Sequence, residues 1–230
     1  MEAIILAGGF GTRLREVVAD VPKAMAPVAG RPFLEILLTV LARKGFTRVV
    51  LSLGYLADKV VGHFGHSFAG MTLLYEIEEV PLGTGGALRA AMTRCEAEHL
   101  FVFNGDTLLD LEAAEAEVRW GEHHAPMIVA REVPDTGRYG RLDIDDGSVR
   151  GFLEKGVSGP GIINAGCYIL PRDLLNEFEL GRAFSFETDY LPSAIKQQQF
   201  NVFLTRGYFI DIGVPEDFAR AQIELAGIAK

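Results

Sequence analysis

Glycine and cationic residues follow the first apolar run of the chain. After residues 3–6, the chain contains Gly8, Gly9, Gly11, Arg13 and Lys23. Glycines allow positive φ and a close approach of the backbone to a ligand, and backbone N–H groups bind phosphate oxygens. Arginine and lysine side chains add positive charge that favours the same oxygens. This segment therefore predicts a binding site for a polyphosphate.

The spacing of these residues differs from two well-known phosphate-binding motifs. No segment has the pattern G-x-x-x-x-G-K-[ST], and the third glycine of G-x-G-x-x-G would fall on Leu14. Gly8 and Gly9 alone are also compatible with an ordinary tight turn between a strand and a helix. Arg13 and Lys23 favour phosphate binding, because they bring two cations to the same end of the strand.

Two aspartates follow apolar segments in positions that suit a metal ion. Asp106 comes after the apolar run 100–103, and Asp211 stands between apolar residues shortly before Pro215. Carboxylate oxygens are preferred ligands of hard cations such as Mg²⁺. Each aspartate taken alone is also explained as a turn or capping residue. Together they predict a Mg²⁺ site.

A second glycine-rich segment, residues 81–87, precedes a predicted helix. It is compatible with a helix entry capped by Thr84, and also with a backbone surface on which a flat base lies. Glu78 stands just upstream. A carboxylate only accepts hydrogen bonds, so it matches the N1–H and N2–H₂ donors of guanine and repels the carbonyls of uracil. A solvated surface glutamate is the alternative.

Three polar residues of the second half suit a phosphorylated sugar. Glu154 offers an acceptor for hydroxyl groups, Lys155 a cation for a phosphate, and Asn164 stands at the start of a predicted strand. Glu154 and Lys155 are also compatible with a surface ion pair.

Composition excludes several classes of partner. The 230 residues carry a net charge of −9, which argues against nucleic acid and anionic membranes as partners. No apolar run reaches the ~18 residues that span a bilayer, and an apolar strand directly after Met1 and Glu2 argues against a signal peptide. Cys95 and Cys167 lack a C-x-x-C pattern and predict reduced thiols. These features predict a cytoplasmic protein.

Strand and helix signals alternate through the first half of the chain. Strands are predicted at 3–6, 49–51, 71–77, 100–103, 127–130, 139–144, 149–154 and 163–170, and helices at 33–44, 56–64, 87–95, 111–123 and 215–226. This order predicts an α/β fold with a mostly parallel sheet, helices on both faces and an antiparallel extension. Ligands of such sheets bind at the carboxyl ends of the strands. One domain, 1–230, is expected, with halves 1–130 and 131–230.

Seven segments carry a family resemblance in chain order. They are LAGGFGTRL (6–14), PK (22–23), PLGTGGA (81–87), NGD (104–106), FLEK (152–155), INAG (163–166) and DIG (211–213). The chain thereby resembles the sugar-1-phosphate nucleotidylyltransferases. The resemblance implies a Rossmann-like three-layer α/β/α sandwich with a mixed, mostly parallel central sheet, of the nucleotide-diphospho-sugar transferase type. It also implies that 1–130 binds the nucleotide and 131–230 the sugar phosphate.

The resemblance further implies a reaction and a role for each residue. A sugar 1-phosphate oxygen attacks the α-phosphorus of a nucleoside triphosphate, and pyrophosphate leaves. Arg13 would hold the pyrophosphate, Lys23 the α-phosphate, and Asp106 and Asp211 a Mg²⁺ ion. The nucleotide would contact Leu6, Ala7, Gly8, Gly9, Gly11, Thr12, Glu78, Pro81, Gly83 and Thr84. The sugar phosphate would contact Asn104, Gly140, Glu154, Lys155 and Asn164.

Within the family, three segments of this chain resemble those of the members that transfer GMP from GTP to D-glycero-α-D-manno-heptose 1-phosphate. They are KAMAP-x₃-RPFLE (23–35), FSFE (184–187) and YFIDIGVPED (208–217). The resemblance implies that the product serves the synthesis of bacterial surface polysaccharides. Ala24 stands where many relatives have proline. Three alternatives stay open: another sugar 1-phosphate such as mannose or N-acetylmuramate 1-phosphate with GTP or UTP, a catalytically silent subunit that senses a nucleotide sugar, and a glycosyltransferase using Asp143 and Asp145 as a D-x-D motif. The sequence leaves open whether the chain forms a homo-oligomer.

Overall fold

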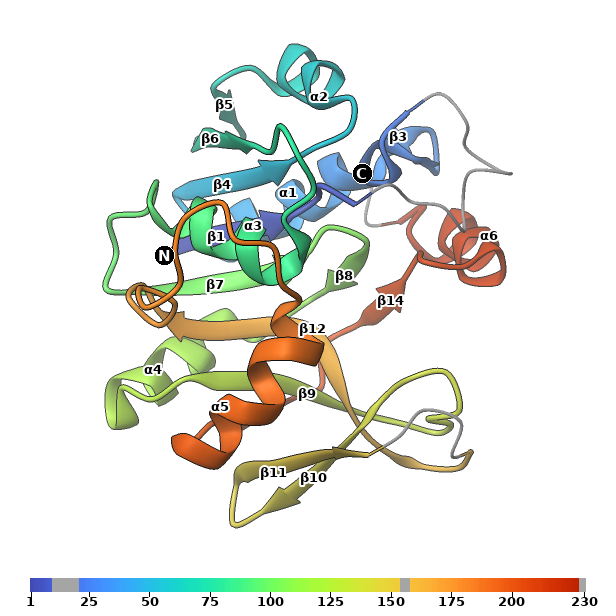
Figure 1. The fold of residues 1–230 in the computed structure, drawn as a ribbon. Helices are drawn as coiled ribbons and strands as arrows, with labels where there is room; N and C mark the ends of the chain where they lie inside the picture. Colours follow the sequence, from blue (N-terminus) through green and yellow to red (C-terminus); the bar gives the residue numbers. More distant parts are fainter. Residues whose placement is uncertain (10–20, 154–157, 228–230) are drawn as a thin grey trace.

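A ten-stranded mixed sheet forms the centre of the molecule (Figure 1). The computed structural model describes residues 1–9, 21–153 and 158–227. In spatial order, the strands are β10 (Arg141–Asp145), β11 (Ser148–Leu153), β13 (Asn201–Thr205), β9 (Met127–Val133), β12 (Gly161–Pro171), β7 (His99–Asn104), β1 (Glu2–Leu6), β4 (Arg48–Leu53), β6 (Met71–Ile77) and β5 (Ser67–Phe68). Two short pairs lie apart from it: β2 (Pro27–Val28) with β3 (Arg31–Pro32), and β8 (Thr107–Leu109) with β14 (Phe209–Asp211).

The direction of the strands changes across the sheet. β6, β4, β1 and β7 are parallel, and the middle residues of β4, β1 and β7 are almost completely buried. Burial on both faces explains why they are continuous apolar runs rather than alternating ones. β12 pairs antiparallel with β7 and β9, and β10 pairs antiparallel with β11. The predicted parallel first half with an antiparallel extension is confirmed.

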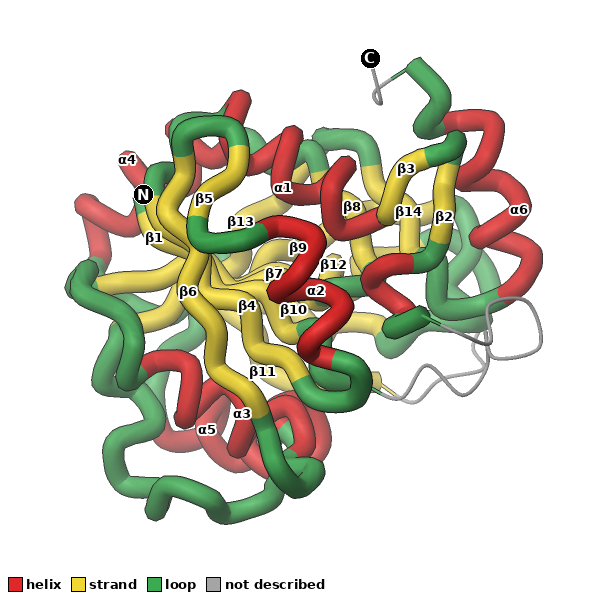
Figure 2. Tube along the Cα trace, turned by 90° about the horizontal axis from the view of Figure 1, so that it is seen from above, coloured by secondary structure: helices red, strands yellow, loops and turns green. Residues whose placement is uncertain are grey.

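Helices cover both faces of the sheet (Figure 2). They are α1 (Phe33–Arg43), α2 (Ala57–Phe64), α3 (Gly83–Met92), α4 (Ala113–His123), α5 (Leu191–Gln197) and α6 (Pro215–Glu224). The apolar residues of α1, α2, α4 and α6 pack in one core, and those of α3 and α5 pack in a second core on the opposite face. The three-layer α/β/α sandwich is therefore confirmed.

Helix α1 follows the signals in its sequence. Pro32 precedes its first residue, Phe33, and Gly45 has φ +88° just beyond its last turn. Its apolar side chains recur every three or four residues and are buried. Helix α3 differs from the prediction, because it begins at Gly83 and not at residue 87. The glycines of the second glycine-rich segment therefore form its first turn.

Several elements escaped the sequence analysis. β13 and α5 were not predicted, because residues 191–205 mix apolar and polar types without a clear period. Asp110, between β8 and α4, forms an ion pair with Lys44 at 2.6 Å. Cys95 and Cys167 are buried free thiols, as predicted. No helix in the described part of the chain is long and apolar enough to cross a membrane.

One sheet connects the two predicted halves of the chain. β12, from the second half, lies between β9 and β7, which belong largely or wholly to the first. The carboxyl ends of β1 and β7 and the short β8–β14 pair that follows β7 then lie on one side of the molecule (Figure 1). This arrangement positions the site described next.

Candidate active site

A cavity of about 330 Å³ opens at the carboxyl ends of the central parallel strands. Its walls come from the turn after β1, the segment between β6 and α3, and the turn after β7. The lining residues are Leu6, Ala7, Gly8, Gly9, Lys23, Ala24, Ser52, Glu78, Pro81, Gly83, Thr84, Ala87, Asn104, Gly105 and Asp106. Most predicted nucleotide-contacting residues that the structure describes are thus brought together, as expected for strand ends in a parallel sheet.

Two glycines make close contacts at this edge, and the contact of Gly105 is with backbone atoms. A Cβ on Gly8 would lie 2.7 Å from Oε1 of Glu78, and a Cβ on Gly105 would lie 2.8 Å from the carbonyl oxygen of Leu6. The backbone N–H of Gly105 donates to that same carbonyl at 2.8 Å. The turns after β1 and β7 therefore pack directly against each other, and they hold Asp106 beside the first glycine-rich turn.

Lys23 and Asp106 form an ion pair at the edge of the cavity. Lys23 lies in a 3₁₀ turn, η2 (Lys23–Met25), and its side chain is 18% exposed, while that of Asp106 is 33% exposed, so both are partly shielded from solvent. Charged groups in such a setting attract each other more strongly than exposed pairs, because water screens them less. The lysine thus holds its ammonium group where an anionic substrate would enter.

Asp211 joins this pair through the β8–β14 pairing. That pairing places Asp211 opposite Thr107, and the N–H of Ile212 donates to the carbonyl of Asp106 at 2.9 Å. A Cβ on Gly213 would lie 2.8 Å from Oδ1 of Asp211 and 3.2 Å from Nζ of Lys23. The predicted association of the two aspartates therefore fits the geometry, although they are far apart in sequence.

The electrostatics at Asp211 suit a bound cation. Burial, and secondarily the negative charge of Asp106, raise the pKa of Asp211, while Lys23 opposes the shift. A divalent cation between the two carboxylates would relieve this repulsion. The described residues contain no cluster of three or more His, Cys, Asp or Glu side chains that could hold a metal by themselves. Two carboxylates completed by substrate phosphates and water are the arrangement that Mg²⁺ favours, so the residues fit this ion.

Glu78 is half-buried and lines the cavity, so it is not a solvated surface residue. Its Oε2 accepts a hydrogen bond from the N–H of Leu82 at 2.8 Å. Burial raises the pKa of Glu78, and the Leu82 hydrogen bond counteracts part of that shift. In the described part of the chain, Oε1 accepts no hydrogen bond, so it remains available as an acceptor at the cavity wall.

Thr84 lines the cavity but does not cap α3, so the capping interpretation is wrong. Its hydroxyl donates to Oε2 of Glu187 at 2.6 Å and accepts from the N–H of Phe186 at 2.9 Å. The hydroxyl proton is therefore engaged within the protein. Thr84 contributes to the wall, while its polar group faces a partner from the second half of the chain.

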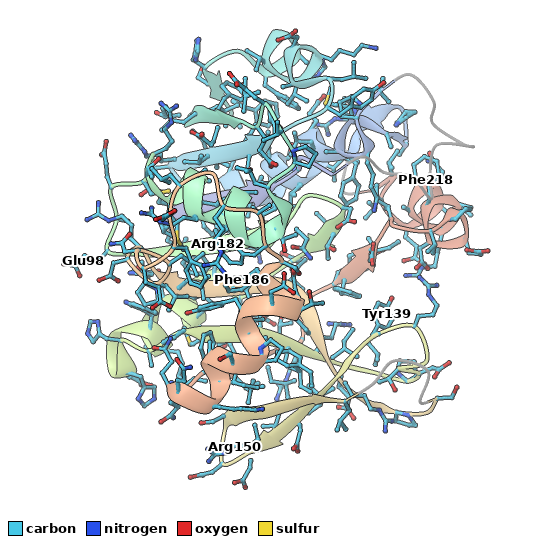
Figure 3. The ribbon with its side chains drawn as sticks, viewed as in Figure 1. Glu98, Tyr139, Arg150, Arg182, Phe186 and Phe218 are labelled. Carbon is cyan, nitrogen blue, oxygen red and sulfur yellow. The ribbon has the colours of Figure 1, made fainter. Side chains whose placement is uncertain are left out.

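Gly85 and Gly86 pack against the protein itself and not against the cavity. A Cβ on Gly85 would lie 2.2 Å from the ring of Phe184, and one on Gly86 would lie 2.3 Å from the carbonyl oxygen of Arg182. Figure 3 shows Arg182 and Phe186 beside α3. Of the three glycines in this turn, only Gly83 is also a cavity residue. The base-stacking interpretation of this segment thus applies to Gly83 alone.

Of the residues predicted to contact the sugar phosphate, Asn104 lines the cavity, whereas Asn164 and Gly140 do not. Asn164, on β12, donates to the hydroxyl of Tyr168 at 2.8 Å. Its Oδ1 accepts the N–H of Gly166, and a Cβ on Gly166 would lie 2.8 Å from Nδ2 of the cavity residue Asn104. Gly140 lies near the carbonyl of Leu153, outside the cavity lining. Gly11, Thr12, Arg13, Glu154 and Lys155 lie outside the described residues.

Sequence reasoning missed two polar residues at this site. Glu187 belongs to the FSFE segment, which carried the resemblance but received no role. Ser52 interrupts the apolar strand β4, a signal that was overlooked, and its fully buried hydroxyl has no hydrogen-bond partner within the described segments. Ser52 is nevertheless among the residues that line the cavity.

The D-x-D motif considered for a glycosyltransferase lies elsewhere. Asp143 and Asp145 are exposed on β10, at the edge of the sheet, and Asp145 is 3.5 Å from Arg150. Figure 3 shows Arg150 on the hairpin far from α3. The glycosyltransferase interpretation is therefore wrong, because the motif forms part of a surface hairpin.

Fold and site together define a class of nucleotide-using enzymes. The family model described as nucleotidyl transferase matches residues 2–227, nearly the full chain. The chain belongs to this family.

Its similar relatives point to one branch of that family. A D-glycero-α-D-manno-heptose 1-phosphate guanylyltransferase from Aneurinibacillus thermoaerophilus is 39% identical over 226 residues, with 98% of each chain covered. The crystal structure of HddC from Yersinia pseudotuberculosis has a TM-score of 0.87 at 41% identity, covering 96% of this chain and 97% of that one, and a second structure of HddC is a complex with GMP-PN. A mannose-1-phosphate guanylyltransferase from Mycobacterium tuberculosis is 34% identical over 236 residues, spanning 100% of this chain and 66% of that relative.

Proposed function

We propose that this protein transfers GMP from GTP to D-glycero-α-D-manno-heptose 1-phosphate, releasing pyrophosphate and forming GDP-heptose. The convergence of Lys23, Asp106 and Asp211 beside a cavity carries the proposal, because this charge arrangement suits phosphoryl chemistry. The full-length similarity to heptose 1-phosphate guanylyltransferases supports the substrates. The product would serve bacterial surface polysaccharide synthesis, in the cytoplasm.

The reaction needs positioning and charge neutralisation more than covalent help from the protein. An oxygen of the sugar 1-phosphate attacks the α-phosphorus of GTP, the bond from that phosphorus to the bridging oxygen breaks, and pyrophosphate leaves with the electron pair. Lys23 moves its positive charge from Asp106 toward the α-phosphate as the triphosphate enters. Mg²⁺ held by Asp106 and Asp211 would supply charge neutralisation at the phosphates. Arg13 would hold the departing pyrophosphate.

The nucleotide would occupy the cavity between the two glycine-rich segments. Residues 6–9 of the first segment and Pro81, Gly83 and Thr84 of the second line this cavity. Oε1 of Glu78 offers the acceptor that matches the N1–H and N2–H₂ donors of guanine. The sugar phosphate would bind toward β12, with Asn104, Gly140, Glu154, Lys155 and Asn164 as its predicted contacts.

Pyrophosphate release tests this function directly. The enzyme is incubated with Mg²⁺, each of the four nucleoside triphosphates and a panel of sugar 1-phosphates including the heptose. We expect release with GTP and D-glycero-α-D-manno-heptose 1-phosphate, and none after chelation of the metal with EDTA. Release with mannose 1-phosphate would favour the second candidate, supported by the 34% identity to a mannose-1-phosphate guanylyltransferase. Release with UTP and N-acetylmuramate 1-phosphate would overturn guanine selection. No release with any pair would favour the silent subunit.

The variant Glu78→Gln tests whether the Glu78 carboxylate recognises the guanine base. The glutamine keeps an oxygen for the N–H of Leu82 but turns an amide donor toward the base, where guanine also presents donors. We expect kcat/KM for GTP to fall about 10–100-fold, the effect of losing a two-point hydrogen bond, while that for UTP rises or stays constant. Steady-state kinetics with both triphosphates measure the ratio. Equal losses for GTP and UTP would contradict a role in base selection, and Glu79→Gln, at the exposed neighbouring position, is the matched control.

A further inference from the structure

Glu187 is a carboxylate near the cavity that the reaction above does not use. It belongs to a short π-helical turn, η3 (Phe186–Tyr190), which packs on α3. In the part of the chain that the structure describes, Glu187 forms no ion pair, and its side chain accepts hydrogen bonds from the hydroxyl groups of Thr84, Tyr168 and Ser185. A half-buried carboxylate whose partners among the described residues are all neutral hydroxyl groups needs an explanation in structure or function.

One oxygen of this carboxylate reaches the nucleotide side of the site. Oε2 accepts the hydroxyl of Thr84 at 2.6 Å, and Thr84 lines the cavity in the first turn of α3. The Thr84 hydroxyl also accepts from the N–H of Phe186, so its proton has one direction in which to point. Glu187 therefore fixes the orientation of the first turn of α3, which forms one wall of the nucleotide cavity.

The other oxygen reaches the sugar side of the site. Oε1 accepts the hydroxyl of Tyr168 at 3.5 Å, and that hydroxyl accepts from Nδ2 of Asn164 at 2.8 Å. Tyr168 is fully buried, and burial raises its pKa well above the ordinary value, so its hydroxyl remains a donor. Oδ1 of Asn164 accepts the N–H of Gly166 at 3.0 Å. The amide of Asn164 is thus held at both ends.

These contacts form one continuous chain of hydrogen bonds from Asn164 through Tyr168 and Glu187 to Thr84. Thr84 and Tyr168 donate to different oxygens of Glu187, and Oγ of Ser185 also donates to Oε2, at 3.4 Å. A carboxylate offers an acceptor on each of its two oxygens, whereas a side-chain amide offers one acceptor oxygen. We propose that Glu187 is a positioning residue that links the nucleotide wall to the sugar-phosphate side, fixing Thr84 with one oxygen and, through Tyr168, Asn164 with the other. The role in turnover rests on the proposed function.

Three variants separate this role from a merely structural one. Glu187→Gln keeps the size of the side chain but has one acceptor for two donors. Tyr168→Phe removes only the branch toward Asn164. Tyr190→Phe is the matched control, because Tyr190 stacks on Phe186 at 5.3 Å in the same turn while its hydroxyl contacts Gln198 and not Glu187.

The kinetic test is the separation of the two KM values. We expect Tyr168→Phe to raise KM for the sugar 1-phosphate about tenfold, as for loss of one buried hydrogen bond, with KM for GTP within about twofold of wild type. Glu187→Gln should raise both KM values, and the double variant should be no worse than Glu187→Gln for the sugar. Tyr190→Phe should leave both values unchanged. Additive effects in the double variant, or unchanged KM values with a lowered Tm, would overturn the proposal.

A second readout does not require turnover. The side-chain amide signals of Asn164, assigned by comparison with Asn164→Asp, should shift in the NMR spectra of Glu187→Gln and Tyr168→Phe but not of Tyr190→Phe. Failure of wild-type enzyme to release pyrophosphate would refute the proposed function, while this comparison still decides the role of Glu187. Unchanged Asn164 signals in both variants would refute the link itself.

Discussion

Replacing Asp106 with alanine is expected to lower kcat on the order of 10³-fold or more, the loss found when charge stabilisation of a phosphoryl centre is removed. Asp106 has two tasks in the geometry: it pairs with Lys23 and, with Asp211, presents carboxylate oxygens for Mg²⁺. Without it, Lys23 is left with Asp211 as the nearby carboxylate, and the metal loses one of its two protein ligands. Single-turnover kinetics with saturating GTP would measure the loss in the chemical step.

The fold should survive this substitution. The backbone carbonyl of Asp106, and not its side chain, accepts the N–H of Ile212 that joins the β8 and β14 segments. The carboxylate is also partly exposed, so alanine leaves no large cavity. Asp110→Ala is the matched control, because this carboxylate follows the same segment but pairs with Lys44 outside the cavity. Circular dichroism and Tm should match wild type for both variants, and near-normal turnover of Asp106→Ala would refute the metal assignment.

Asp211→Asn should combine a loss of turnover with a gain in stability. Asparagine keeps an oxygen for the N–H of Gly213, which Oδ1 of Asp211 accepts at 2.6 Å, but it removes the buried charge that faces Asp106. We expect kcat to fall about 10²–10³-fold through loss of a metal ligand. Without metal at neutral pH, Tm should rise by about 2–4 °C, the shift that ~1 kcal/mol produces in a domain of this size.

The pH dependence of this gain has a defined sign. Burial and Asp106 raise the pKa of Asp211 in the folded protein, so the folded state binds more protons than the unfolded chain. Wild-type stability therefore declines as pH rises from the ordinary aspartate range through the raised pKa, and the decline is complete above it. The variant lacks this titration, so its advantage in Tm should shrink as the pH is lowered into the ordinary aspartate range.

Magnesium should reverse the order of the two proteins. An ion that binds the folded state stabilises it, so Mg²⁺ should raise the Tm of wild type more than that of Asp211→Asn. Asp143→Asn, at an exposed position on β10, serves as the control and should change neither Tm nor turnover. Two results together would contradict a metal site at Asp106 and Asp211: a wild-type Tm that is the same with and without Mg²⁺, and a kcat of Asp211→Asn within about tenfold of the wild-type value.

Sequence patterns were sufficient to predict which residues line the cavity at the carboxyl ends of the parallel strands. Gly8, Gly9 and Asp106 directly follow apolar strands, and the carboxyl ends of neighbouring parallel strands must lie at one edge of a sheet. Glu78 follows β6, which is parallel to the same set of strands and lies on the far side of β4 from β1. Local order along the chain therefore predicted which of these residues meet, without knowledge of any side-chain contact.

The family could also be predicted from the sequence, because the segments that carry the resemblance occur in order over nearly the full length of the chain. The start of α3 could not be predicted from the sequence, because glycine residues have a low helix propensity and the first turn of α3 contains three of them. Packing against Phe184 and Arg182 overrides that preference, since only glycine leaves room for their approach.

What the sequence determined by itself is the alternation of strands and helices and the placement of Glu78 and Asp106 just beyond strand ends, since both follow from local periodicity. The tertiary structure decided the rest. Asp211 reaches Asp106 only because β14 pairs with β8 across about one hundred residues of chain, and Glu187 reaches Thr84 only because η3 packs on the glycines of α3. Such contacts depend on the free energy of packing distant segments together, which no local pattern encodes.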